Sequence, residues 1–338
     1  MSGHRIIANT VNTFDQESLS FLRKQVQSQQ LICGGENKTF DMINPASVID
    51  LVEKPCATPA STAFGHRRLF FENRFVYTVI SPRTRGLSIG INMNPDQSCN
   101  FDCVYCEVAR SLPAVAQSLD VGVMAEELEK TLSLVQSGGI REHPACRSVS
   151  SELLQLRQVA LSGDGEPTLC PNFTEAIEAV VHVRARRTVS CVKLALITNG
   201  SRLDSRAVRK GLRCLTPNDE IWIKLDAGTQ TYMERVNRSE VPLEKVIENM
   251  LLVGRQRPII IQSLFSLIHG QGPPPQEIDE YIHRLRDLKR GGAQISLVQI
   301  YSATRPMAHD YCGHLPLKEM SRIRQRIKAE TGLRAEVF

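Results

Sequence analysis

The chain lacks any uninterrupted run of about 18 apolar residues, so its sequence predicts no membrane-spanning helix. Its first residues lead into polar sequence without an apolar signal core, which argues against export. Aromatic residues are scarce at 5%, whereas an apolar content of 42% and a charged content of 23% are ordinary for a globular protein. We therefore expect a cytoplasmic protein, and its 338 residues suffice for one large domain with a buried core.

The sequence has little excess of either charge. It contains 41 Lys and Arg residues and 36 Asp and Glu residues, which give a net charge of +5. This small excess permits an anionic partner such as RNA without requiring one. The sequence contains 10 cysteines, but a chain of this length without an export signal needs no disulfides. Three of them are clustered, and clustered thiols in a reducing compartment are typical of metal ligands.

The pattern along the chain changes near residue 86. Residues 1–85 indicate an N-terminal extension, with a helix near residues 16–27 and a strand within residues 68–80. Residues 86–338 alternate short apolar runs with amphipathic helical segments and end in a helix. Wholly apolar strands between helices predict parallel pairing with both faces covered, which is an α/β fold. Six such units would make a partial (β/α)6 barrel, although a doubly wound open sheet gives a similar pattern.

The expected elements can be given by range. Strands are expected at residues 87–93, 158–162, 192–198, 220–226, 259–265 and 294–301. Helices are expected at residues 124–136, 172–186, 201–213, 243–255, 276–290 and 317–330. Residues 111–156 are long for one connection, so an insertion or a mobile loop is expected within residues 137–151. In a barrel, the chemistry would lie at the C-terminal ends of the strands.

The strongest local signal is Cys99-Asn-Phe-Asp-Cys103-Val-Tyr-Cys106, which directly follows the first expected barrel strand. A tight loop with this spacing can direct three thiolates at one cubane cluster and leave one iron without a protein ligand. A zinc site normally has four ligands, or three and a water, and an electron-transfer cluster has four cysteines. The open iron therefore fits a [4Fe-4S] cluster that binds a cofactor. Three core cysteines or a zinc knuckle are the alternatives, and the polar loop fits burial of plain core cysteines poorly.

This motif, after the first strand of a β/α pattern, resembles the radical S-adenosylmethionine (SAM) superfamily over roughly residues 68–310. The resemblance implies a barrel of the radical SAM type, with a [4Fe-4S] cluster on Cys99, Cys103 and Cys106. It implies that SAM binds the open iron and is cleaved to a 5′-deoxyadenosyl radical, which abstracts hydrogen from a substrate. It also implies that Tyr105 lies against the adenine, and that a protein of the flavodoxin or ferredoxin type donates the electron.

A glycine-rich motif, Gly163-Asp164-Gly165-Glu166, ends the second expected strand. Glycines permit close approach of the backbone, and a carboxylate there can accept hydrogen bonds from an ammonium group. In the radical SAM family, a Gly-Gly-Glu-like motif at this place binds the amino group of SAM. This sequence departs from that pattern, so Asp164 and Glu166 are both candidates for the contact. The alternative is a plain turn between strand and helix.

Polar residues continue along the next expected strands. Thr198 and Asn199 end the third strand, where they can hydrogen-bond a ribose or a carboxylate or form an ordinary turn. Lys224 and Asp226 alternate with apolar residues on the fourth strand, so both charges should point to one face. They would contact SAM or substrate, or form a structural pair. Gln262 on the fifth strand extends the same polar ring.

Within the superfamily, the sequence is similar to the iron–sulfur oxidoreductases related to wyosine-base synthesis in tRNA. Archaeal members carry upstream cysteines for a second cluster, and here only Cys33 and Cys56 lie upstream. We expect no flavodoxin-like domain, which eukaryotic members carry, within these 338 residues. We therefore expect the core chemistry to transfer, with a tRNA base or another RNA component as a candidate substrate. An activating enzyme for a glycyl radical on a partner protein, and a non-catalytic iron–sulfur module, are the alternatives.

Two further clusters outside these motifs are candidates for function. Cys312 is close in sequence to His309 and His314, and these residues could hold a metal, donate a hydrogen atom or be ordinary loop residues. A basic stripe at helical spacing could lie along RNA phosphates or form a solvated helix face. The stripe consists of Arg202, Arg206, Arg209 and Arg213.

Overall fold

The computed structural model describes residues 68–108, 118–187, 192–303, 307 and 309–338. Within them an eight-stranded sheet has the order β1-β2-β3-β4-β5-β6-β8-β10, and β7 pairs with β9 in a small second sheet. The strands are β1 (Val76–Ser81), β2 (Gly86–Asn92), β3 (Leu156–Ser162), β4 (Lys193–Thr198), β5 (Glu220–Lys224), β6 (Ile259–Leu264), β7 (Ser266–Ile268), β8 (Ile295–Tyr301), β9 (Cys312–His314) and β10 (Ala335–Val337). The helix expected near residues 16–27 lies outside the described residues.

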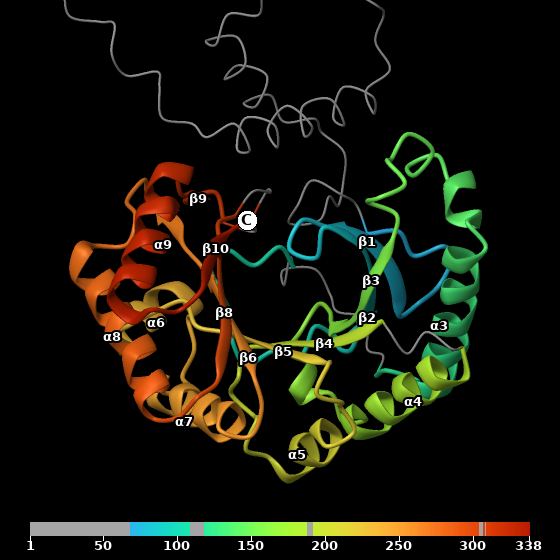
Figure 1. Ribbon diagram of the computed structural model, residues 1–338, viewed down its shortest axis with the longest axis horizontal. Coiled ribbons are helices and arrows are strands. Elements are labelled where there is room, and N and C mark those ends of the chain that lie inside the picture. Colours follow the sequence, from blue (N-terminus) through green and yellow to red (C-terminus); the bar gives the residue numbers. More distant parts are fainter. Residues whose placement is uncertain (1–67, 109–117, 188–191, 304–306, 308) are drawn as a thin grey trace, which may run out of the picture.

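Helices follow the strands along the chain. They are α3 (Val121–Gln136), α4 (Phe173–Arg186), α5 (Arg206–Leu212), α6 (Gln230–Asn237), α7 (Leu243–Gly254), α8 (Pro275–Arg290) and α9 (Leu317–Thr331). Figure 1 shows the sheet curled into an arc, with α3, α4, α5, α7 and α8 along its outer side. Within the large sheet, β2, β3, β4, β5, β6 and β8 are parallel and stand in sequence order. A doubly wound sheet would reverse its order at a switch point, so the fold is the α/β partial barrel that the sequence predicts.

The two faces of the sheet differ in chemistry. On the outer face, side chains such as Ile223, Ile261 and Val298 are fully buried in the main core. Alternate residues along the strands point to the inner face, where Trp222 and Ile260 belong to a separate small apolar cluster. The inner face therefore has room for polar residues that the helix-covered face excludes.

The strand β1 pairs antiparallel with β2, from Val76 opposite Ile91 to Ser81 opposite Gly86. It confirms the strand expected within residues 68–80. It precedes residue 86, where the extension was expected to end, and it belongs to the same sheet as the barrel strands. The segment at residues 137–151 packs on this part of the sheet, since Ile140 is buried in a cluster with Leu87.

The expected helix at residues 201–213 is wrong at its start. The structure begins α5 at Arg206, because the Ser205 hydroxyl accepts a hydrogen bond from the Val208 N–H at 3.2 Å and caps the helix. Arg202 therefore lies in the preceding turn and not on the helix. Among the described residues, no helix is both long and apolar enough to cross a membrane.

Candidate cluster and cofactor site

The loop with the three clustered cysteines follows β2, at the edge where the parallel strands end. Cys99, Cys103 and Cys106 are each partly buried. The Asp102 N–H donates to the Asn237 carbonyl at 3.0 Å, which fixes the middle of the loop to the end of α6. The loop is thus held in place by backbone contacts as well as by its own turns.

Three thiols in one loop could hold a single metal ion or an iron–sulfur cluster, and the two differ in the geometry that they require. Among the described residues, no three His, Cys, Asp or Glu side chains are placed to hold one metal ion. A cubane has no such requirement, because each thiolate binds a different iron. Burial, with the charge of Asp226, raises the pKa of the Cys103 thiol to about 12, so a bound metal would have to displace its proton. The Asn237 Nδ2 lies 3.3 Å from the Cys103 Sγ and can donate to the resulting thiolate.

A buried polar network joins this loop to β5 and α6. The Tyr105 hydroxyl donates to the Asp226 carboxylate, and the Asn237 Nδ2 donates to the same Oδ2 at 3.0 Å. The Lys224 Nζ lies 3.4 Å from the Asp226 Oδ1 and donates to the Tyr301 hydroxyl at 2.9 Å. Lys224 and Asp226 therefore point to the same side of the strand, as their alternation predicts, and they form an ion pair.

Lys224 is also placed beside an aromatic ring. Its Nζ lies 4.9 Å from the centroid of the Tyr105 ring. Burial alone lowers the pKa of Lys224, but the charge of Asp226 and its other neighbours raises the pKa above its usual value. The side chain is therefore a cation, and a cation over a ring face strengthens the fixed position of Tyr105.

The glycine-rich motif packs directly on the chain that leads to Cys99. Gly163 has a φ of 144°, and a Cβ there would lie 2.3 Å from the Asn92 Oδ1. A Cβ on Gly165 would lie 2.1 Å from the Ser98 carbonyl oxygen. Glycine is required at both positions because the two loops approach more closely than a side chain allows.

The two carboxylates of this motif lie in different environments. Glu166 is 3% exposed and accepts hydrogen bonds from the Thr168 Oγ1 at 2.6 Å, from the Asn199 N–H at 2.7 Å and from the Thr198 hydroxyl. Burial raises the pKa of Glu166 against the effect of these bonds. Glu166 thus ties the end of β3 to the end of β4.

Asp164 is the more accessible of the pair, with a side chain that is 27% exposed. It pairs with the Arg68 Nη1 at 2.6 Å and accepts from the Asn92 Nδ2 at 2.7 Å. The two candidates therefore differ in accessibility. Glu166 is enclosed by hydrogen-bond donors from the chain, and Asp164 remains partly exposed to solvent.

The remaining expected polar residues lie at neighbouring strand ends. The Asn199 Nδ2 donates to the Asn100 Oδ1 at 2.8 Å, so the end of β4 is joined to the cysteine loop. The Thr198 hydroxyl donates its hydrogen bond to the Glu166 carboxylate. The Gln262 Nε2 donates to the Gln299 Oε1 at 2.9 Å, and both side chains are buried.

Arg238 is a residue that the sequence patterns did not indicate. It has a φ of 44°, and its guanidinium donates to the Asp102 carboxylate at 2.5 Å and lies 2.7 Å from the His309 Nε2. Cys312 is buried in β9, and the His314 Nδ1 lies against a backbone carbonyl. Within the described part of the chain, these residues do not form a metal site.

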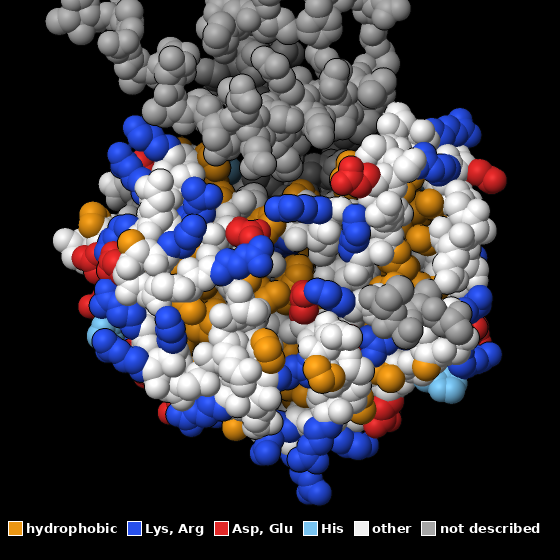
Figure 2. All heavy atoms as spheres, in the orientation of Figure 1, with side chains coloured by type: hydrophobic (Ala, Val, Ile, Leu, Met, Phe, Trp, Pro, Cys, Tyr) orange, Lys and Arg blue, Asp and Glu red, His pale blue; other side chains and the backbone are white. Residues whose placement is uncertain are grey.

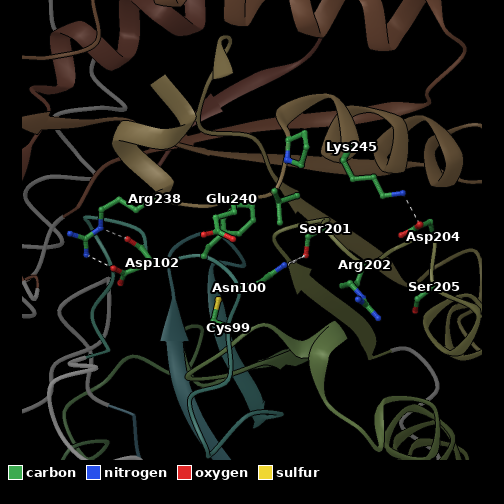
Figure 3. A pocket seen from close by; sticks show the side chains of 13 residues that line it. Cys99, Asn100, Asp102, Ser201, Arg202, Asp204, Ser205, Arg238, Glu240 and Lys245 are labelled. Atoms are coloured by element: carbon green, nitrogen blue, oxygen red, sulfur yellow. Dashed lines mark hydrogen bonds and ion pairs between the residues drawn. The ribbon is translucent and has the colours of Figure 1, made fainter. Parts of the chain in front are cut away.

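A groove of about 880 Å³ borders the cysteine loop on one side. Figure 3 shows Cys99 and Asn100 facing the residues that follow β4 and α6, and two ion pairs, Arg238–Asp102 and Lys245–Asp204, at its sides. The groove is lined by Cys99, Asn100, Phe101, Asp102, Ser201, Arg202, Asp204, Ser205, Arg238, Glu240, Val241, Pro242 and Lys245.

The chain matches no protein-family model. A UPF0026 protein of Helicobacter pylori is 23% identical over 178 residues, which are 52% of this chain and 50% of that protein. A UPF0026 protein of Methanocaldococcus jannaschii is 26% identical over 174 residues, which are 51% of this chain and 47% of that protein. The chain thus spans about half the length of the curated relatives that it matches.

Solved structures with low sequence identity are also similar. A structure of TYW1 with a lysine–pyruvate adduct bound has a TM-score of 0.47 and 14% identity, over 94% of this chain and 90% of that chain. A structure of SuiB from Streptococcus suis bound to S-adenosylmethionine has a TM-score of 0.48 and 12% identity, over 96% of this chain and 61% of that chain.

Proposed function

We propose that the protein is a radical SAM enzyme with one [4Fe-4S] cluster on Cys99, Cys103 and Cys106. The observation that carries the proposal is one ordered loop with three thiols, directly after the first parallel strand of a partial barrel. Barrel enzymes carry out their chemistry at this edge of the sheet. Three thiolates leave one iron open to a cofactor, which neither a closed zinc site nor an electron-transfer cluster does.

When bound and reduced, the cluster would supply the electron that breaks the bond between sulfur and C5′ of SAM. The chain's own residues would bind and orient SAM. Asp164 keeps an exposed surface beside the glycine-rich motif, so it is the carboxylate that can accept a hydrogen bond from the SAM ammonium group. Tyr105 is fixed by Asp226 and Asn237, and its ring is the candidate surface for the adenine.

The inner wall of the barrel would complete the cofactor site. Lys224 and Gln262 lie opposite each other on the neighbouring strands β5 and β6, where both side chains point inward. Lys224 is held as a cation with a partly exposed side chain, so it offers a fixed polar group to a ribose or a substrate, whereas Gln262 is buried and held by Gln299. Thr198 and Asn199 position the cysteine loop through Glu166 and Asn100.

We also propose a base of tRNA, or another RNA component, as the substrate, and a flavodoxin or ferredoxin as the electron donor. The support for the substrate is the similarity of the sequence motifs to wyosine-related enzymes, together with a net charge of +5. Treatment of total small RNA with the enzyme, followed by nucleoside mass spectrometry, tests the substrate.

The chemistry is tested by anaerobic reconstitution. The protein should bind about four iron and four sulfide per chain, and with dithionite and SAM it should release 5′-deoxyadenosine and methionine. Cys103→Ala should prevent assembly of the full cluster. Cys214→Ala is the matched control, because Cys214 is a partly buried thiol outside the loop. A full cluster in Cys103→Ala would contradict the ligand assignment, and a full, reducible cluster that yields no 5′-deoxyadenosine would indicate a non-catalytic module.

A further inference from the structure

We propose that the groove beside Cys99, together with the arginines of α5, is the docking surface for an acidic one-electron redox protein. The inference rests on the proposed function, because reductive cleavage of SAM needs one electron from outside the chain. A reduced flavodoxin or ferredoxin would lose one electron, and the cluster would gain it and change from the 2+ to the 1+ state. No bond is formed or broken in this step.

The position of the groove suits electron entry. One of its walls is the cysteine loop itself, from Cys99 to Asp102, so a protein bound there would lie directly against a cluster ligand. The inner-face side chains of Tyr105, Lys224 and Gln262 are not among the described residues that line the groove. The loop can therefore be approached from the groove without entry into the inner side of the barrel.

The charged residues that line the groove balance in number, with three cations and three carboxylates, whereas the arginines on α5 and at its end form no ion pair among the described residues. Inside, Arg238 pairs with Asp102 at 2.5 Å and Lys245 pairs with Asp204 at 2.7 Å. Figure 2 shows Lys and Arg side chains gathered at the lower edge of the molecule, over α5. The exposed arginines there are Arg202, which lines the groove, and Arg206, Arg209 and Arg213 on α5 or at its end.

These four arginines carry unneutralised charge. In the part of the chain that the structure describes, no carboxylate forms an ion pair with any of the four, although the neighbouring Lys210 lies 3.5 Å from Glu178. A surplus of positive charge beside a cluster ligand attracts a negatively charged partner and speeds its association. The chemistry therefore fits a small acidic protein.

The geometry favours a compact partner over an RNA strand. The four arginines do not form one helix stripe, because α5 begins at Arg206 and Arg202 lies in the turn beside the groove. The positive charge thus spreads from the helix to the groove that Cys99 also lines. A redox protein requires this closeness to the cluster, whereas contact with RNA phosphates does not.

The test replaces the four arginines and measures flavodoxin binding and SAM cleavage in separate assays. A matched control removes four exposed cations from α8 and α9, far from α5 in Figure 1. The affinity for recombinant oxidised flavodoxin is measured by fluorescence anisotropy at low and moderate salt, with and without the cluster. The test variant is Arg202→Gln/Arg206→Gln/Arg209→Gln/Arg213→Gln, and the control is Arg290→Gln/Lys318→Gln/Arg322→Gln/Lys328→Gln.

In the test variant, flavodoxin affinity at low salt should fall about tenfold or more and its salt dependence should flatten, while the control stays unchanged. SAM cleavage with limiting reduced flavodoxin should fall, and cleavage with dithionite should not. Unchanged flavodoxin affinity, or equal weakening in the control, would overturn the docking surface. If the test variant lost affinity for unmodified tRNA but still cleaved SAM with reduced flavodoxin, the docking proposal would be overturned and the arginines would be assigned to RNA binding. Absence of dithionite-driven cleavage in the unsubstituted protein would instead contradict the proposed function itself.

Discussion

Asp219→Asn should destabilise the protein far more than Lys193→Gln, although both residues form ion pairs at the same end of β4 and β5. The Asp219 side chain is 0% exposed, and it accepts from the Arg184 Nη1 at 2.5 Å and from the N–H groups of Leu194 and Thr216 at 2.8 Å and 2.7 Å. The Lys193 side chain is 51% exposed. The two pairs thus differ in burial while they share their place in the sheet.

The magnitude follows from the burial of the partner. Asp219→Asn leaves the Arg184 guanidinium, which is 9% exposed, without its counter-charge. Removing one member of a buried pair costs about 3–5 kcal/mol of unfolding free energy. Breaking an exposed pair such as Lys193–Glu220 costs about 0.2–1 kcal/mol. The two variants should therefore differ by at least about 2 kcal/mol.

The loss of unfolding free energy caused by Asp219→Asn should depend on pH. Burial alone raises the pKa of Asp219, but the hydrogen bonds from Arg184, Leu194 and Thr216 outweigh it, and the pKa lies below its usual value. A depressed pKa means that the folded state favours the carboxylate, so this stabilisation is present above the unfolded pKa of about 3.9 and is lost as the pH falls through the folded value. The gap between Asp219→Asn and the unsubstituted protein should be full at neutral pH and should shrink below about pH 4.

The assay uses the chain's single tryptophan. Trp222 is buried in β5, and its indole N–H donates to Glu220 at 2.8 Å, so its fluorescence reports unfolding of the sheet at this place. Urea titration under reducing conditions gives the unfolding free energies of both variants and of the unsubstituted protein. If Asp219→Asn and Lys193→Gln had equal midpoints, the argument from burial would be refuted.

Two further substitutions test the cysteine loop. Gly165→Ala should displace the loop, because the new Cβ would lie 2.1 Å from the Ser98 carbonyl oxygen. The iron that the protein retains after gel filtration should therefore fall. Gly122→Ala is the control, because its Cβ would have no atom closer than 3.4 Å. Asn237→Leu removes a donor to the Cys103 Sγ and should lower the unfolding free energy of the cluster-free protein by about 1–3 kcal/mol, as measured by urea titration. An unchanged iron content in the first variant, or an unchanged midpoint in the second, would contradict these roles.

The regular elements of the fold were predictable because their signals are local. The strands β3, β4 and β6 each contain an unbroken run of at least three apolar residues, and the helices between strands show helical periodicity along many residues. The short pairs were not predictable. The strands β7 and β9 have three residues each and are defined by pairing with each other across the chain, which no local pattern records.

The site was predictable in the same unequal way. The three candidate cluster cysteines stand out in the sequence because their spacing lies within one loop. The residues that hold the loop were not, since Asn237 contacts Cys103 across 134 positions and Asn199 contacts Asn100 across 99. The difference between Asp164 and Glu166 also escaped the sequence, because it depends on burial at the junction of two strands.

The contacts of the cysteine loop are compatible with both of the partners that we propose, SAM and an electron-donor protein. The Glu166 N–H donates to the Ser98 carbonyl at 2.9 Å just before the loop, and the Asn237 Nδ2 lies 3.3 Å from the Cys103 Sγ in its middle. These contacts come from the side of the sheet and leave Cys99 at the wall of the groove. An enzyme of the proposed kind must receive an electron from a protein and yet keep its radical away from that protein. A loop that is fixed by the strand ends, with the cofactor on its inner side and the donor in the groove, meets both requirements.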